Sequence, residues 1–110
     1  KVVVKSHQFL LTKITDSLST LALIGSSKKP MELRHHSRRY KILHYLAEKK
    51  TKVKTSALAE KFEMNEVDVR GAITEVKARV KRAFGLSLNA IFDNDQSGEG
   101  YSVTNVDVKK

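Results

Sequence analysis

The chain has 110 residues, a length that suits one small domain with a modest core. No apolar run approaches the roughly 18 residues that a membrane helix needs, so we expect no membrane partner. Cysteine is absent, which excludes disulfides and thiolate metal sites and fits a reducing compartment.

The formal net charge of +9 is concentrated in the first half of the chain. Residues 1–54 hold 13 lysines and arginines against 3 aspartates and glutamates, whereas residues 87–110 hold 2 against 4. The densest stretch is 34–54, where eight cations are opposed only by Glu48. Such a patch favours a polyanion, because each phosphate that it neutralises releases condensed counterions. The alternative interpretation is a basic surface that serves only solubility.

The first 17 residues have an ambiguous pattern. Phe9, Leu10 and Ile14 have helical spacing, so residues 1–17 are expected to form an extra helix or a linker from an upstream domain. The chain opens on Lys1 rather than methionine, and we expect it to be part of a longer protein with an upstream regulatory domain. Two short runs, 18–24 and 30–34, then surround a Gly/Ser turn and predict a β-hairpin.

Three amphipathic segments follow the predicted hairpin. Ser37 is suited to cap a first helix, and a polar connection over 51–54 leads to a second helix over 57–62. Asn65 is suited to cap a third helix, and Gly85 suits the left-handed residue after its end. The third helix has a continuous apolar seam made of Val69, Ile73, Val76, Val80 and Phe84.

The C-terminal part of the chain has the pattern of a second hairpin. Residues 90–92 and 101–103 have strand character, and the segment 93–98 between them is dense in turn-forming residues. Residues 105–110 are polar, and we expect them to form a flexible tail.

Three stretches together resemble the winged helix-turn-helix of the OmpR/PhoB type, the DNA-binding output domain of many bacterial response regulators. They are Lys29-Pro30-Met31-Glu32-Leu33, Glu66-Val67-Asp68-Val69-Arg70 and Gly98-Glu99-Gly100-Tyr101-Ser102-Val103. The resemblance covers residues 18–104. It implies an α+β winged helix-turn-helix, with a three-helix core, an N-terminal hairpin and a C-terminal β-hairpin wing.

The chain departs from this family at two places that bear on function. Only Glu63-Met64-Asn65 separates the second and third helices, so the family's contact with RNA polymerase is not carried over. Asp93, Asp95 and Glu99 make the predicted wing acidic, and carboxylates there would repel phosphates. A winged helix of another family is the alternative.

The candidate site residues follow from placing the third helix in a major groove. Arg70 suits guanine O6 and N7, and Thr74 suits either a thymine methyl group or a phosphate. The expected base contacts are Arg70, Thr74, Lys77 and Lys81. The expected phosphate contacts are Arg38, Arg39, Lys49, Lys50, Lys52, Lys54, Arg79 and Arg82.

No pattern of an enzyme is present, because a nucleophile motif, a phosphate loop and paired carboxylates are all missing. We therefore expect no enzymatic activity and no cofactor. His35, His36 and His44 lack a completing ligand, so we expect no metal site. The favoured function is sequence-specific binding of double-stranded DNA in a cytoplasmic transcriptional regulator, associated with the nucleoid if the source is bacterial. The alternatives are a winged helix used for protein contact or homodimerisation in a larger assembly, or for RNA binding.

Overall fold

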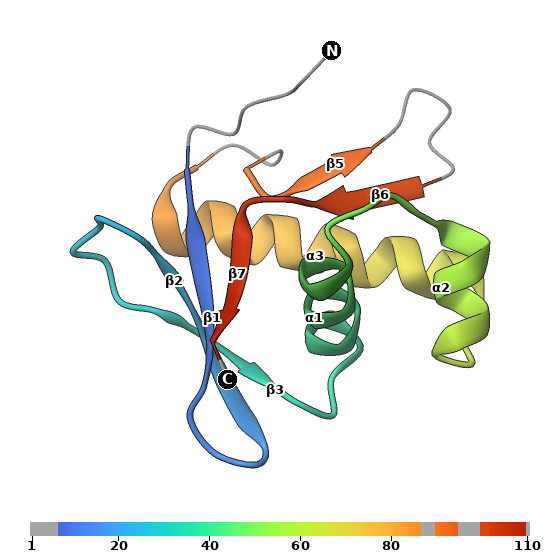
Figure 1. The fold of residues 1–110 in the computed structure, drawn as a ribbon, viewed down its shortest axis with the longest axis horizontal. Helices are drawn as coiled ribbons and strands as arrows, with labels where there is room; N and C mark the ends of the chain where they lie inside the picture. The colour runs from blue at the N-terminus through green and yellow to red at the C-terminus, as the bar shows by residue number, and fades with distance from the viewer. Residues whose placement is uncertain (1–6, 87–89, 95–99, 110) are drawn as a thin grey trace.

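The computed structural model describes residues 7–86, 90–94 and 100–109 and has an α+β fold with three helices and two sheets (Figure 1). In chain order the elements are β1 (Phe9–Lys13), β2 (Leu18–Leu23), β3 (Met31–Arg34), α1 (Arg38–Lys49), β4 (Val53–Lys54), α2 (Thr55–Lys61), α3 (Glu66–Phe84), β5 (Phe92–Asn94), β6 (Gly100–Val103) and β7 (Val106–Lys109). The long α3 crosses the molecule behind α1, with α2 near its beginning and the strands β1, β2 and β7 toward its end.

The larger sheet has four strands in the order β3-β2-β1-β7. β2 and β3 pair antiparallel, with Leu18 opposite Arg34 and Leu21 opposite Met31, which confirms the predicted hairpin over 18–24 and 30–34. This hairpin is only half of the sheet, because β1 adds to β2 antiparallel and β7 adds to β1 in parallel. The sheet is therefore mixed, and its strand order differs from the arrangement that the sequence predicted.

Residues 9–13 form the strand β1, so the prediction of a linker or an extra helix over 1–17 is wrong for this part of the segment. Phe9 and Leu11 are buried whereas Leu10 between them is only half-buried, and this alternation is that of a strand. Ile14, which a helix would place on the same apolar face, is 55% exposed. Phe9 and Leu11 are thus buried on one face of a strand, although the spacing of the apolar residues fits a helix.

Residues 106–109 form β7, so the predicted flexible tail over 105–110 is wrong for 106–109. Val106 is fully buried and pairs with Phe9 of β1. The Lys50 ammonium donates to the Val106 carbonyl at 2.8 Å, which ties the end of α1 to this strand. The buried Asn105, just before β7, is also held, by hydrogen bonds to two backbone carbonyls.

The smaller sheet has three strands in the order β4-β6-β5 and joins the α1–α2 connection to the C-terminal hairpin. β5 and β6 pair antiparallel, which confirms the predicted hairpin, although its first strand begins at Phe92 rather than residue 90. β4 was predicted only as a polar connection, yet Lys54 pairs with Gly100 of β6. A Cβ atom at Gly100 would lie 3.2 Å from the Val53 carbonyl oxygen, so glycine allows this close approach.

The acidic wing is an expectation that the structure does not describe. Asp95 and Glu99, the Gly98 of the wing motif and the side chain of Asp93 lie outside the described residues.

The predicted capping residues define the ends of α1 and α3. The Ser37 hydroxyl accepts the Tyr40 amide at 3.2 Å, and the Asn65 side-chain oxygen accepts the Asp68 amide at 2.8 Å. Gly85 follows α3 in the left-handed conformation with φ 68°. The predicted seam of α3 is buried at all five positions, so this helix packs against the core along its whole length.

Candidate nucleic-acid interface

The buried seam of α3 leaves a broad exposed surface, which has two sides. Successive residues of a helix are turned by about 100°, so Arg70, Thr74, Lys77 and Lys81 share one side of the seam, whereas Asp68, Glu75 and Arg79 share the other. The Lys77 ammonium lies 6.0 Å from the centre of the Tyr101 ring in β6, so we call the first side the β6 flank. Arg79 lines a groove with β3, so we call the second side the β3 flank.

The β6 flank brings together the four residues for which base contacts were predicted. Arg70, Thr74 and Lys81 are exposed, and Lys77 is half-buried beside Tyr101. The Arg70 guanidinium donates to the Glu66 carboxylate at 3.3 Å, one helical turn earlier. This exposed pair contributes little to stability, so Arg70 can exchange Glu66 for another acceptor at small cost.

Between the two flanks runs an outer line of small residues, Val67, Gly71 and Ala78. Val67 is 72% exposed, and a Cβ atom added to Gly71 would meet nothing within 4 Å. A glycine inside a helix lowers its stability by about 0.5–1 kcal/mol relative to alanine. The outer line therefore offers a surface that another molecule can approach closely.

The β3 flank carries two ion pairs to the beginning of α1. The Arg39 guanidinium lies 2.6 Å from the Glu75 carboxylate, and the Arg38 guanidinium lies 3.8 Å from that of Asp68. Arg39 was predicted to contact phosphate, but its side chain is only 29% exposed and already holds a carboxylate. Arg39 thus serves to join α1 to α3 as well as to add positive charge.

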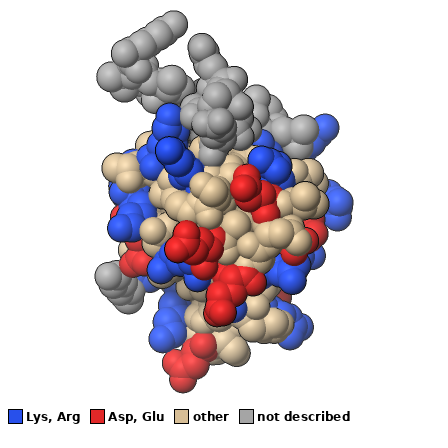
Figure 2. Space-filling model, turned by 90° about the vertical axis from the view of Figure 1, so that its right-hand side faces the viewer, with Lys and Arg blue, Asp and Glu red and all other residues tan. Residues whose placement is uncertain are grey.

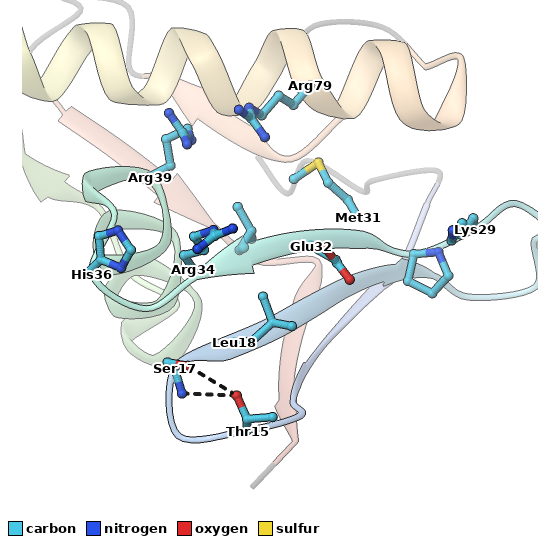
Figure 3. A pocket seen from close by; sticks show the side chains of 12 residues that line it. Thr15, Ser17, Leu18, Lys29, Met31, Glu32, Arg34, His36, Arg39 and Arg79 are labelled. Atoms are coloured by element: carbon cyan, nitrogen blue, oxygen red, sulfur yellow. Dashed lines mark hydrogen bonds between the residues drawn. The ribbon is translucent and has the colours of Figure 1, made fainter.

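A groove of about 690 Å³ lies between the β3 flank and β3, and most of its charged lining is basic. The charged and titratable residues that line it are Lys29, Glu32, Arg34, His36, Arg39 and Arg79. Figure 3 shows Arg39 and Arg79 extending into the space between α3 and β3. Lys29 and Arg34 were not among the predicted site residues, because only the packing of β3 beside α3 brings them into the groove that Arg79 also lines.

The lysines predicted to contact phosphate lie at the other end of α1 from Arg38 and Arg39. The 12 residues of α1 separate the two groups by about 16 Å. Lys50 is bound to the Val106 carbonyl, Lys49 lies 5.6 Å from the Tyr45 ring, and the Lys52 stem packs beside Gly100. The exposed Lys54 ends β4, where it pairs with Gly100 of β6, and the exposed Arg82 lies next to the outer line of α3. The structure therefore does not join the predicted phosphate contacts into one patch.

The end of the molecule that carries α2 and the beginning of α3 has mixed charge. Figure 2 looks at this end, and acidic side chains lie near the middle of the face with basic ones around them. Glu60, Glu63 and Glu66 are exposed in this part of the chain. Attraction to a polyanion is accordingly weaker here than along the second half of α3, where Arg79, Lys81 and Arg82 are exposed.

Two of the three histidines considered as metal ligands, His35 and His44, have structural contacts. His35 is within hydrogen-bond distance of the Ser19 hydroxyl (2.7 Å) and the Asp16 carbonyl (2.9 Å), and its ring stacks on Tyr40. The His44 ring also stacks on the Tyr40 ring, with the ring centres 5.3 Å apart, and its Nδ1 lies 3.3 Å from the Glu48 carboxylate. Within the described ranges, no group of three or more His, Cys, Asp or Glu side chains is arranged to hold a metal ion.

Comparisons with protein-family models, with curated protein sequences and with solved structures found no match to this chain. Among the described residues, no helix is both long enough and apolar enough to cross a lipid bilayer.

Proposed function

We propose that this chain is a winged helix-turn-helix domain that binds double-stranded DNA sequence-specifically, as the DNA-binding part of a transcriptional regulator. The element order supports the proposal. A short α2 and a four-residue turn over 62–65 precede α3, and the hairpin that follows α3 shares a sheet with β4 from the α1–α2 connection. Such a role implies a location with the DNA, in the cytoplasm or on the nucleoid if the source is bacterial.

The observation that carries the proposal is the surface of α3. An outer line of uncharged residues, Val67, Gly71 and Ala78, runs along the helix. The β6 flank beside it carries Arg70, Lys77 and Lys81, and the β3 flank carries Arg79 next to Asp68 and Glu75, whose charges are paired with Arg38 and Arg39. The major groove of B-DNA is about 12 Å wide, and a helix with its side chains is about 10–12 Å across. A helix that fits this groove needs short side chains at its centre and positive charge toward the two backbones. The second half of α3 meets both needs, with Lys81 on one flank and Arg79 on the other.

Base reading is assigned to the β6 flank. Arg70 offers a planar pair of donors that matches guanine O6 and N7, once it exchanges Glu66 for the base. Thr74 is exposed next to it and offers a methyl and a hydroxyl group. Lys77 and Lys81 extend the flank toward the end of α3, where ammonium groups suit either a guanine or a phosphate.

The proposal is tested by fluorescence anisotropy with labelled duplex DNA over a series of salt concentrations. We expect wild-type binding to weaken steeply as salt rises, because phosphate contacts release counterions. Lys81→Ala should make the slope of log K against log salt shallower by about one if it contacts phosphate, and Arg70→Ala should reduce sequence preference. Absence of duplex binding even at low salt would refute the proposal.

The matched control for these variants is Lys13→Ala. Lys13 is an exposed cation on β1, and it lies outside the surface of α3. Its removal changes the net charge by the same amount as Lys81→Ala, so a specific contact at Lys81 must show as a larger change in slope.

A second candidate function is protein contact within a larger assembly or a homodimer. The pairing of Arg38 with Asp68 and of Arg39 with Glu75 favours it, because half-neutralised arginines are weaker phosphate ligands. A protein complex that persists at high salt, from a chain that retains no duplex DNA, would select this function. Competition between duplex DNA and structured RNA in the same titration separates the proposal from RNA binding.

A further inference from the structure

The groove between β3 and the β3 flank of α3 gathers cations from separate parts of the chain. Lys29 precedes β3, Arg34 ends it, and Arg79 lies in the second half of α3. These three side chains are exposed, and the carboxylate that lines the same groove is Glu32. Lys29 and Arg34 lie at the two ends of β3, so the positive charge is spread along the groove, and a polyanion that runs along it would be attracted by each cation in turn.

The position of the groove relative to α3 identifies the kind of polyanion. A helix in the major groove has one sugar-phosphate backbone along each of its flanks, because it nearly fills the width between them. On one flank of α3 lie Lys77 and Lys81, toward β6. On the opposite flank, the Arg79 side chain lines the groove beside β3 (Figure 3).

We infer that this groove holds backbone phosphates of the DNA strand on the β3 side of α3, with Arg34 and Arg79 as the principal contacts. The inference rests on the proposed function and extends it. It assigns to the four-stranded β-sheet a contact with the second strand of the DNA. Guanidinium groups suit the role, because their forked donors match phosphate oxygens. The groove carries no base-reading role, so it increases affinity for all sequences alike.

The test compares two double variants of the full chain that each remove two positive charges. Arg34→Gln/Arg79→Gln changes the groove and keeps most of both side-chain stems. Lys13→Gln/Lys109→Gln is the control, because these exposed lysines line a different depression beside Tyr40 and His44. Both variants are first checked for an unchanged unfolding midpoint, and their affinity for one duplex is then measured over a series of salt concentrations.

We expect the groove variant to bind more weakly at every sequence and to give a slope of log K against log salt shallower by about two, whereas the control keeps the wild-type slope. If the groove variant binds with the wild-type affinity and slope while the wild type binds DNA, the inference fails and the proposed function stands. If the wild type itself shows no salt-dependent duplex binding, the proposed function and the inference both fail.

Discussion

Asn105 joins three parts of the chain through one buried side chain. Its amide nitrogen donates to the His7 carbonyl at 2.9 Å, ahead of β1, and to the Ala90 carbonyl at 2.7 Å, ahead of β5. Asn105 is 3% exposed and its bond to the Ala90 carbonyl is buried, so water does not replace the amide at that carbonyl when the side chain is removed. In the sequence it looks like any polar residue of a C-terminal tail, because nothing local shows which distant backbone groups it meets.

Replacing Asn105 should therefore affect stability more than its position near the C-terminus suggests. We expect Asn105→Ala to lower the free energy of unfolding by about 1–3 kcal/mol, the cost of leaving buried polar groups unpaired. Asn105→Asp should cost more, because a carboxylate has no donor and would face two carbonyl oxygens. Urea denaturation measures both, with the exposed Thr104→Ala as the control. An Asn105→Asp variant as stable as wild type would contradict the buried contacts.

At the scale of elements, α3 is the helix that sequence reasoning describes best. Asn65, the five-residue seam and Gly85 mark its beginning, its buried face and its end through local rules of capping and periodicity. β1 and β7 could not be predicted in the same way. Their parallel pairing joins Phe9 to Val106, and no local pattern specifies a partner so far along the chain.

Two substitutions at Gly71, on the outer line of α3, should affect the free energy of unfolding and the affinity for duplex DNA differently. Gly71→Ala should raise the free energy of unfolding by about 0.5–1 kcal/mol, because alanine favours a helix and the position has open space. Gly71→Gln should also fold, but its side chain would hold α3 away from the bases. We expect about a tenfold or greater loss of duplex affinity, the size of one lost base contact of ~1–3 kcal/mol.

Thermal unfolding and duplex titration of the Gly71 variants measure the two effects. Gly71→Ala is the control for the change in backbone freedom, since it adds only one methyl group. Wild-type affinity in Gly71→Gln would show that the outer line of α3 does not face DNA.

At the scale of the whole molecule, the two flanks of α3 meet different sheets, since Lys77 lies over Tyr101 of the smaller sheet and Arg79 lines a groove with β3 of the larger one. The β6 flank was within reach of sequence reasoning, because Arg70, Thr74, Lys77 and Lys81 follow helical spacing. The groove on the β3 flank was not, since Arg34 and Arg79 are far apart in sequence and come to line one groove only through tertiary packing. The predicted run of basic residues over 34–54 is divided in the same way, with its two halves at opposite ends of α1.

The central claim, that α3 places this domain on specific duplex DNA, is tested most directly by selection from a random duplex library at moderate salt. We expect an enriched sequence motif, retained by Gly71→Ala and lost by Gly71→Gln. Two half-sites spaced by about ten base pairs would in addition identify a homodimer. Recovery of no motif, together with no retention of duplex DNA when the selection is repeated at low salt, would contradict the claim.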